Sequence, residues 1–308
     1  MASIFLVGPG AIGATLAAWL CQDDRHQVTV GARTAFDSIE TTTPNGVLRA
    51  KPRVITEAAQ ATPVDWILAT TKTYDSETAA EWFPKATGTR TRLAVIQNGV
   101  EHIERFEKHF DRARIVPVMI DLPAERLSPG RTVQHGPAHL VVPASDNGAA
   151  FLALFAHANF DAKQTDDFTT AVWTKLCLNS GGAPCAVLAK PNGIAHHEGV
   201  ARLIHDIVRE CVLVGRAQGA KLEDSIPDEI VERTRKAPRD SGNSMYADRL
   251  AGRPMEYDAR NGVIVRLGRK HGIPAPMNEL MVSLLEAAQG NRRWQLTGPP
   301  ASVVGCDP

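Results

Sequence analysis

The chain contains 308 residues, of which 44% are hydrophobic and 22% are charged, as in a soluble globular protein with enough length for two domains. Its 34 lysines and arginines balance its 34 aspartates and glutamates, so the formal net charge is zero. A neutral chain lacks the basic surface that attracts phosphate backbones, and we expect no nucleic-acid partner. No stretch approaches the ~18 consecutive apolar residues of a membrane span, so we also expect no membrane association.

The cysteines and the first residues bear on the compartment. Five cysteines are scattered along the chain, at positions 21, 177, 185, 211 and 306, and none forms a CxxC pair. This odd, dispersed set predicts neither a disulfide framework nor a metal site. The opening residues MASIFLVGPG lack the basic leader of a signal peptide. We therefore predict a cytoplasmic protein with no metal.

Short strand-like runs alternate with helical patterns in the first half of the chain. The runs are rich in β-branched residues and lie at residues 3–8, 26–32, 65–71, 92–97 and 114–120. Their apolar residues do not alternate with polar ones, which is typical of parallel strands buried on both faces. Helices are expected between several of them, over residues 11–23 and 76–86. Residues 131–143 are expected to form a hairpin that finishes the sheet.

The pattern changes after about residue 167. Residues 200–219, 257–272 and 278–290 have apolar positions at helical spacing, without a strand signal of weight. We therefore predict an α/β Rossmann domain over residues 1–167, an all-α domain over residues 168–293, and a C-terminal tail over residues 294–308.

A glycine motif follows the first predicted strand. Gly8, Gly10 and Gly13 form GxGxxG at the junction of a predicted strand and a predicted helix, the context that supports dinucleotide binding. The first glycine permits a tight turn, the second lets a pyrophosphate approach, and the third lets helix and strand pack closely. The helix N-terminus then offers free N–H groups to the phosphates. The predicted cofactor-binding segment comprises Gly8, Pro9, Gly10, Ala11, Ile12 and Gly13.

The residue after the second strand bears on the choice of cofactor. Arg33 stands twenty residues after Gly13, where an NAD-binding unit usually has an acid for the ribose 2′-OH. An arginine suits a 2′-phosphate, and Lys72, after another strand, could add a second positive charge. We predict NADP (NADPH) as the cofactor. The alternative is that both side chains are solvated surface residues.

Three polar positions are candidates for the reaction itself. Lys175 and Asn179 lie four residues apart in an otherwise apolar helix, so both project from the same face. Asn98 ends the fourth strand, and ligands of open parallel sheets bind beyond the carboxyl ends of strands. The alternatives are a satisfied core lysine and an ordinary Asn-Gly turn.

A second polar group lies within residues 242–262. Ser244 and Asp248 are four residues apart, and Glu256 begins the next helix. Ser244 is expected to cap a helix and Glu256 to be a first-turn acid, while both side chains also face a cleft.

These motifs together resemble the ketopantoate reductase family (2-dehydropantoate 2-reductase). The resemblance rests on the glycine motif, TKTYD, QNGV, WTKLCLNS, SMYADRLAGRPMEYDARNG and GRKHGIPAPMNELM, in this order, from residue 3 to about residue 286. It implies a fold like that of 6-phosphogluconate dehydrogenase, with a Rossmann domain, a helical domain and a cleft between them. It also implies NADPH-dependent reduction of 2-dehydropantoate to pantoate, in pantothenate biosynthesis.

The resemblance further implies a role for each candidate residue. Lys175 would be the catalytic proton donor, which suits an ammonium beside the alkoxide that hydride attack creates. The implied substrate contacts are Asn98, Asn179, Asn192 and Ser244, although the spacing from Lys175 to Asn192 is one residue short. The implied cofactor contacts outside the glycine segment are Arg33, Lys72, Asn98 and Glu256. Hydroxyl and amide donors are expected to receive the substrate's carboxylate without a salt bridge.

One departure leaves the substrate open. The family usually has a second asparagine one turn after the first, and here that position is Ala183. A site that loses a hydrogen-bond partner loses discrimination, so a relative that reduces another 2-oxo acid or ketone is the alternative. A non-catalytic NADP-binding sensor is a further alternative, against which the Lys175–Asn179 pair argues. The helical domain offers surfaces for a homodimer.

Overall fold

The computed structural model describes residues 1–289, and its first part is built on a six-stranded parallel sheet. The strands lie in the order β5 (Arg53–Ile55), β2 (His26–Gly31), β1 (Ala2–Val7), β6 (Val64–Ala69), β7 (Thr87–Val95) and β8 (Ile115–Pro117). The chain runs outward from β1 to β5 and then returns to the other side of β1. This is the doubly wound order, in which the crevice at the reversal point binds ligands.

Both faces of this sheet are covered, which explains the unbroken apolar runs. Along β1, Ile4 and Leu6 pack in one core cluster while Phe5 and Val7 pack in another. Helices α1 (Ala11–Leu20) and α4 (Asp146–Ala153) contribute to the first cluster. Helices α2 (Ser76–Ala80) and α3 (Phe83–Ala86) contribute to the second. The helix expected over residues 76–86 is thus two short helices, with Pro84 in the first turn of the second.

Two smaller sheets complete this part, and they correct two expectations. One has the order β10 (Ala124–Ser128), β11 (Arg131–Gln134), β3 (Ile39–Thr43) and β4 (Gly46–Ala50); the other has β13 (Asp161–Thr165), β12 (His139–Pro143) and β9 (Met119–Asp121). The hairpin expected over residues 131–143 is wrong, because β11 and β12 belong to different sheets. The strand expected over residues 114–120 divides into β8 and β9 for the same reason.

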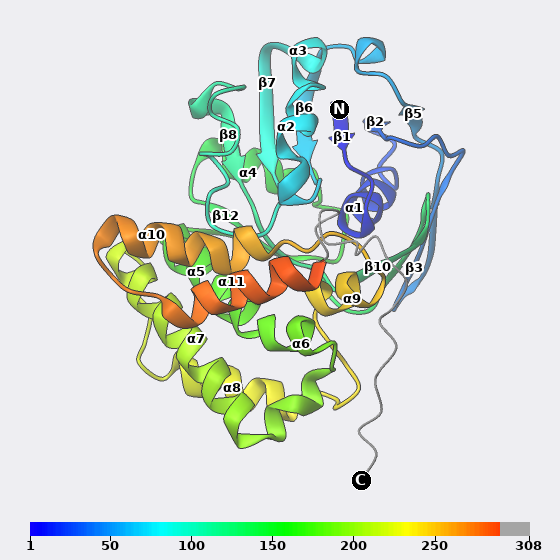
Figure 1. Cartoon of the computed structure of the whole chain (residues 1–308). Helices are drawn as coiled ribbons and strands as arrows, with labels where there is room; N and C mark the ends of the chain where they lie inside the picture. Colours follow the sequence, from blue (N-terminus) through cyan, green and yellow to red (C-terminus); the bar gives the residue numbers. More distant parts are fainter. Residues whose placement is uncertain (290–308) are drawn as a thin grey trace, which may run out of the picture.

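The second part is helical, as the sequence predicts. Its helices are α5 (Phe168–Gly181), α6 (Ala183–Leu188), α7 (Glu198–Ala217), α8 (Ile226–Lys236), α9 (Ser244–Leu250), a π-helix (Asp258–Gly262), α10 (Val263–His271) and α11 (Pro276–Gln289). In Figure 1 these elements, coloured green to red, lie together below the sheet, and α5 contacts β9 and β12. The structure therefore confirms the predicted fold class. The tail predicted over residues 294–308 lies outside the described residues.

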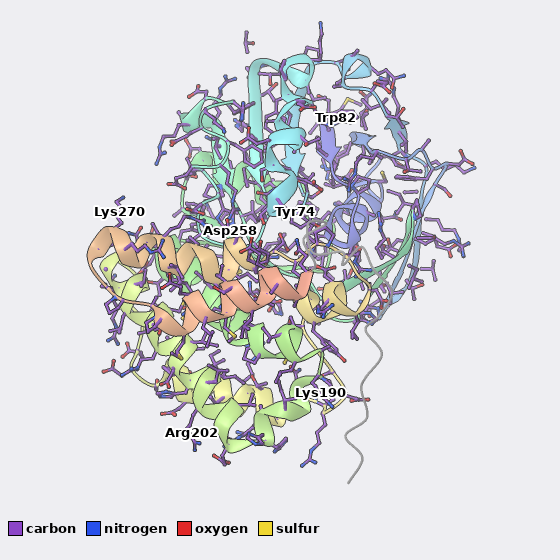
Figure 2. The ribbon with its side chains drawn as sticks, viewed as in Figure 1. Tyr74, Trp82, Lys190, Arg202, Asp258 and Lys270 are labelled. Carbon is purple, nitrogen blue, oxygen red and sulfur yellow. The ribbon has the colours of Figure 1, made fainter. Side chains whose placement is uncertain are left out.

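Side chains from both parts meet at the junction. Figure 2 labels Tyr74, from the sheet part, and Asp258, the first residue of the π-helix, at this boundary. Lys190 and Arg202 lie at the opposite end of the helical part. Within the described range, no helix combines the length and the apolar character that crossing a bilayer requires.

Candidate active site

Lys175 projects from α5 toward a carboxylate of the sheet part. Its Nζ lies 2.6 Å from Oδ1 of Asp121, the last residue of β9, and the lysine side chain is 19% exposed. Burial lowers the pKa of Lys175 below the ordinary lysine value, and the hydrogen bond and charge of Asp121 offset part of that effect. Asp121 was not among the predicted site residues, although it directly follows a predicted strand.

Two side-chain amides link Asn179 of α5 to the carboxylate of Glu256. Asn179 donates from Nδ2 to Oδ1 of Asn98 at 3.3 Å, and Asn98 donates from Nδ2 to Oε2 of Glu256 at 2.9 Å. A narrow pocket adjoins these amides, lined by Gln97, Asn98, Gly99, His102, Met119, Ile120, Val172, Lys175, Leu176 and Asn179. The structure therefore brings together Lys175, Asn179 and Asn98, as the sequence predicts.

Glu256 and Asp248 reach across to Lys72. Lys72 Nζ lies 2.8 Å from Oδ2 of Asp248 and 3.1 Å from Oε2 of Glu256, and both carboxylates are buried. Glu256 also accepts a hydrogen bond from the backbone N–H of Thr73 at 3.1 Å. Burial alone would raise the pKa of Glu256, but the charges of Lys72 and Arg260, with these hydrogen bonds, lower the pKa to about 2. Glu256 is therefore a carboxylate at neutral pH.

The expected capping role of Ser244 is wrong, and Glu256 is not a first-turn acid, because it precedes the N-cap residue Tyr257 of the π-helix. The capping residue of α9 is Asn243, whose Oδ1 accepts from the backbone N–H groups of Met245 and Tyr246 at 3.0 Å. Ser244 is the first helical residue, and its Oγ instead accepts a hydrogen bond from Nη2 of Arg260 at 2.7 Å. Arg260, which was not among the predicted site residues, is almost fully buried, at 2% exposure.

Asn192 does not line the pocket around Lys175. It lies in a short 3-10 helix (Asn192–His196), where its Nδ2 donates to Ser241 Oγ at 3.0 Å and its Oδ1 accepts from Cys185 Sγ at 3.6 Å. Both polar ends of this amide thus have protein partners.

Ala183 also points away from the pocket. Helix α5 ends at Gly181, and Ala183 opens α6 fully buried in an apolar cluster with Met245, Met255 and Met281. The polar stripe of α5 therefore ends at Asn179.

The glycine loop has the shape that a dinucleotide needs. Gly8 has φ +93°, and a Cβ on Gly13 would lie 2.3 Å from the Gly8 carbonyl oxygen, so neither position accepts a larger residue readily. A Cβ on Gly10 would meet nothing within 4 Å, which leaves open space beside the backbone. Among the described residues, the N–H groups of Ala11, Ile12 and Gly13 have no hydrogen-bond acceptor. Residues 8–13 thus fit a pyrophosphate at the start of α1.

Arg33 lies at the same edge of the sheet and is largely exposed. Its Nη2 is 3.6 Å from Oδ2 of Asp75, and the arginine side chain is 84% exposed. Asp75 ends the 3-10 helix (Thr73–Asp75) that directly follows Lys72. The segments that carry Arg33 and Lys72 are therefore neighbours, but the Lys72 ammonium itself contacts Asp248 and Glu256.

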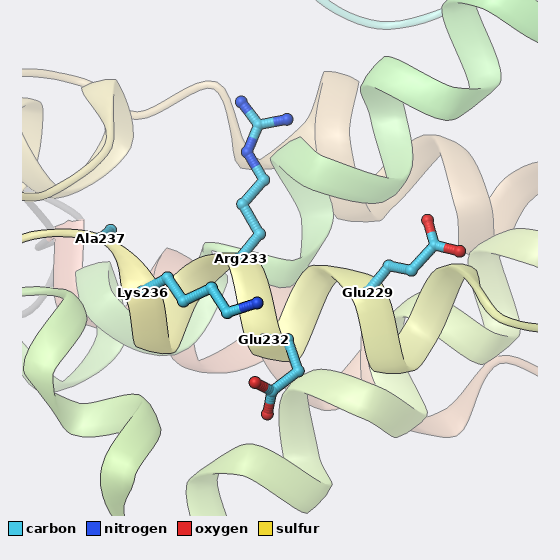
Figure 3. A pocket seen from close by; sticks show the side chains of 5 residues that line it. All are labelled: Glu229, Glu232, Arg233, Lys236 and Ala237. Carbon is cyan, nitrogen blue, oxygen red and sulfur yellow. The ribbon is translucent and has the colours of Figure 1, made fainter.

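A hollow of about 550 Å³ runs along α8. It is lined by Glu229, Glu232, Arg233, Lys236 and Ala237, and Arg233 extends from the helix on the side opposite Glu232 (Figure 3).

Two arginines also act on Lys175. Burial and Asp121 have the largest effects on the pKa of Lys175, and the positive charges of Arg260 and Arg233 lower it further. Lys175 therefore has a carboxylate in direct contact, from Asp121, and the charges of two arginines act on it less strongly.

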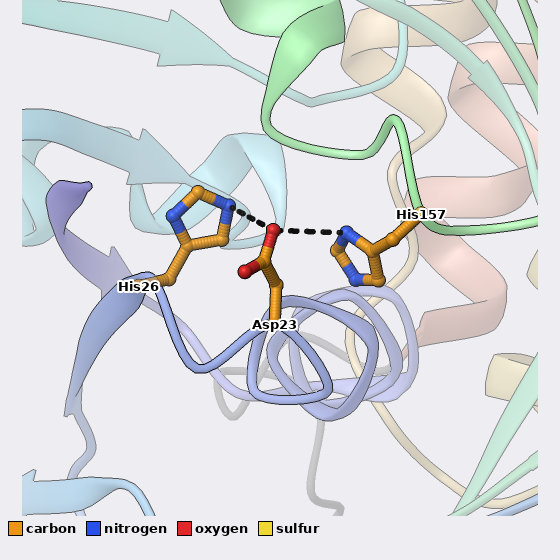
Figure 4. A group of neighbouring side chains, drawn as sticks. All are labelled: Asp23, His26 and His157. Carbon is orange, nitrogen blue, oxygen red and sulfur yellow. Dashed lines mark ion pairs between the residues drawn. The ribbon is translucent and has the colours of Figure 1, made fainter.

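Asp23, His26 and His157 form a separate cluster at the start of β2 (Figure 4). Asp23 Oδ2 lies 3.8 Å from His26 Nε2 and 3.7 Å from His157 Nδ1. His26 Nε2 also binds the carbonyl oxygen of Leu154 at 3.1 Å, and both Asp23 oxygens accept bonds from Arg25. Because Asp23 and His26 Nε2 already bond to protein groups, we assign the cluster a structural role.

Comparison with known proteins gives a consistent result. The model of the family Ketopantoate reductase PanE/ApbA matches residues 4–147, and that of its C-terminal domain matches residues 167–289. The chain is 49% identical over 288 residues to a 2-dehydropantoate 2-reductase of Caulobacter vibrioides, covering 94% of this chain and 99% of the relative. It is 36% identical over 291 residues to a protein of the same name from Mycobacterium tuberculosis, covering 92% and 97%.

Solved structures agree with the sequence relatives. A PanE/ApbA family ketopantoate reductase from Ralstonia eutropha superposes with a TM-score of 0.86 at 26% identity, covering 93% of this chain and 98% of the other. A 2-dehydropantoate 2-reductase from Geobacter metallireducens gives the same TM-score and identity, covering 93% and 99%. A D-mandelate dehydrogenase, solved with NADH and anilino(oxo)acetate, shares the fold at 20% identity and a TM-score of 0.83. The chain belongs to the ketopantoate reductase family.

Proposed function

We propose that this protein is an NADPH-dependent 2-dehydropantoate 2-reductase that makes pantoate, a step of pantothenate biosynthesis. The observation that carries the proposal is Lys175, a largely buried lysine with a lowered pKa, beside the amides of Asn179 and Asn98. The relative at 49% identity, which the chain covers almost completely, bears the name of this enzyme.

The residues around Lys175 divide the work of a ketone reduction. NADPH, when bound, supplies the hydride that attacks the C2 carbonyl carbon. Lys175 donates the proton that the new alkoxide needs, and its positive charge stabilises that oxygen as charge develops. Asp121 holds the ammonium in place at 2.6 Å. Asn98, Asn179 and Ser244 orient the substrate, so that the carbonyl meets the hydride and the proton in one arrangement.

We assign the cofactor contacts to the sheet edge and to one residue of the helical part. Residues 8–13 receive the pyrophosphate, and Arg33, whose exposed guanidinium can form two hydrogen bonds, receives the 2′-phosphate. Lys72 adds its charge there only by giving up its ion pairs with Asp248 and Glu256. Glu256, which reaches across to Thr73 and Asn98, is placed to accept hydrogen bonds from a ribose hydroxyl. For Asn192 to contact the substrate, its Nδ2 must exchange its hydrogen bond to Ser241 for one to the substrate.

One observation favours a second candidate substrate. Ala183 is fully buried among apolar side chains, so it offers no amide to a substrate hydroxyl. A pocket without that amide discriminates less well against acids that lack the hydroxyl. The alternative is therefore the same chemistry on another 2-oxo acid or ketone. A non-catalytic NADP sensor would not need the Lys175–Asp121 pair.

The test is NADPH oxidation with 2-dehydropantoate and a panel of other 2-oxo acids. We expect 2-dehydropantoate to give the highest kcat/KM and Lys175→Ala to lower kcat by roughly 10²- to 10⁴-fold. If another acid has a higher kcat/KM, the substrate assignment is wrong but the proposed mechanism stands. Tight NADPH binding without turnover of any acid would favour the sensor, and unchanged kcat in Lys175→Ala would remove the proton-donor role.

Compartment and assembly complete the proposal. We propose a cytoplasmic location; Cys177 donates from Sγ to Cys211 Sγ at 3.5 Å, and both are free thiols among the described residues. We also propose a homodimer formed through the helical part, to be measured by light scattering on the purified protein. A monomer at micromolar concentration would contradict it.

A further inference from the structure

Arg260 has fewer protein partners than an arginine at its depth requires. It is 2% exposed, and its guanidinium carries five N–H donors. Within residues 1–289, one hydrogen bond is present, from Nη2 to Ser244 Oγ at 2.7 Å, and the buried Nε–H has no acceptor. A buried guanidinium with so few hydrogen-bond partners is unfavourable for folding, which points to a role beyond stability.

The nearby carboxylates are already paired with other cations. Glu256 and Asp248 both contact Lys72, and Asp248 also contacts Arg253 at 2.8 Å. Both carboxylates act on Arg260 through their charge, but neither forms an ion pair with it in the described part of the chain. Lys175 is likewise paired with Asp121. The charge of Arg260 is therefore available to an anionic ligand.

The backbone places Arg260 against the reaction residues. It lies in the π-helix, whose next residue, Asn261, donates from Nδ2 to the carbonyl oxygen of Ser180 at 3.3 Å. Ser180 directly follows Asn179 on α5. The charge of Arg260 is also close enough to Lys175 to act on its titration. Single-turn π-helices of this kind occur often at functional sites.

Ser244 extends the same binding surface. Its Oγ accepts from Arg260, and because a hydroxyl has one hydrogen to donate, that hydrogen remains available for a ligand oxygen. A guanidinium and a hydroxyl side by side offer several hydrogen-bond donors and a positive charge. This combination is complementary to a carboxylate, which is negative and only accepts hydrogen bonds.

We propose that Arg260, together with Ser244, binds the carboxylate of the 2-oxo acid and makes this protein select acids over neutral ketones. The proposal rests on the proposed function only in taking a 2-oxo acid as the substrate. It also replaces the expectation that hydroxyl and amide donors alone receive this carboxylate. A salt bridge at one end of the substrate then fixes the C2 carbonyl for the hydride and for Lys175.

The test uses Arg260→Leu and Arg260→Lys in the full-length protein. In Arg260→Leu we expect KM for the acid to rise by roughly 10- to 100-fold, because a charge-assisted pair is lost, while KM for NADPH stays within about twofold. The carboxylate is bound equally in ground and transition states, so kcat should change much less than KM. Arg260→Lys should recover part of the loss, because an ammonium keeps the charge but not the two-pronged geometry.

The neutral amide of the same acid is the decisive second substrate. Wild type should use it poorly, and Arg260→Leu should lower kcat/KM for the acid but leave that for the amide nearly unchanged. Equal losses for acid and amide, or a rise in KM for NADPH instead, would overturn the proposal. The matched control is Arg269→Leu, which removes an exposed arginine of α10 paired with Glu279 and should change none of these constants.

A binding measurement keeps the test independent of turnover and of folding. The acid, added with NADP⁺, should raise the Tm of wild type but not that of Arg260→Leu, whose own Tm shows that it is folded. If wild type prefers a different 2-oxo acid, the proposed substrate fails, and the same comparison is made with the preferred acid. If wild type reduces 2-dehydropantoate but Arg260→Leu binds it as tightly, the role of Arg260 fails alone.

Discussion

Replacing Lys72 by methionine tests whether its two ion pairs join the sheet part to the helical part. Lys72 follows β6, whereas Asp248 and Glu256 belong to the helical part. In Lys72→Met, Glu256 keeps its hydrogen bonds from Thr73 and Asn98, but it loses the cation that lowers its pKa most. A buried carboxylate without that cation destabilises the fold.

The pKa of Glu256 sets the magnitude. It falls from 4.5 to about 2 on folding, and at 1.36 kcal/mol per unit this corresponds to about 3 kcal/mol of stability. Because Lys72 is the first of four favourable contributions, we expect Lys72→Met to remove roughly 2 kcal/mol at pH 7.5. For a chain of this size, that lowers Tm by roughly 4–8 °C.

The dependence on pH has a definite sign. A carboxyl group whose pKa is lowered on folding contributes its full stability above the unfolded value, here 4.5, and loses it as pH falls toward 2. The Tm difference between wild type and Lys72→Met should therefore be full at pH 7.5 and narrow steadily below pH 4.5. Thermal unfolding followed by circular dichroism measures it.

Two variants complete the experiment. Lys270→Met removes an exposed lysine of α10 and should leave Tm unchanged within about 1 °C. Adding Glu256→Gln to Lys72→Met should restore part of the loss, because it removes the unpaired charge. Equal Tm values for wild type and Lys72→Met at pH 7.5, or a difference that does not change with pH, would refute the reasoning.

Three further predictions concern the proton donor, the cofactor and the turn after α5. Asp121→Asn removes the negative charge that keeps the pKa of Lys175 up, so kcat, which needs the protonated lysine, should fall off at lower pH than in wild type; an unchanged pH–rate profile would contradict this. Arg33→Ala should raise KM for NADPH by roughly 10-fold but leave KM for NADH unchanged, since the 2′-phosphate alone loses a partner; equal changes would contradict it. Gly182→Ala would put a Cβ 2.6 Å from Nδ2 of Asn243, which donates to the Gly182 carbonyl at 2.9 Å; we expect a loss of about 1–3 kcal/mol in urea unfolding, and wild-type stability would show that the α9 cap adjusts freely.

The sheet could be predicted from the sequence because its cause is local. Residues such as Ile4 and Phe5 are both apolar since both faces of β1 are covered, and that shows directly in the sequence. The pairing of β11 and β12 could not be predicted in the same way. Their partners, β3 and β9, are chosen by contacts between residues far apart in the chain, and two strand-like runs joined by a short loop look like a hairpin whatever sheet they enter.

The site residues also differ in whether the local sequence indicates them. The four-residue spacing of Lys175 and Asn179 placed them on one helix face, and the structure joins Asn179 to Asn98. Glu256 and Arg260 have the same spacing, so this signal was present for Arg260 as well. Asp121 carried no such signal, because its partner lies 54 positions further along the chain and meets it only through the packing of α5 on β9.

The π-helix before α10 determines which side chains of this segment face the site and which face the core. It buries four consecutive residues, Ala259 to Gly262, although successive residues of an α-helix point about 100° apart and a surface helix buries only one face. The widened turn thus lets Arg260 face the site while Val263 and Ile264 of α10 enter the core. Deleting one residue here would turn α10 by about 100° relative to Glu256, so the length of this segment is constrained as strictly as the identity of its residues.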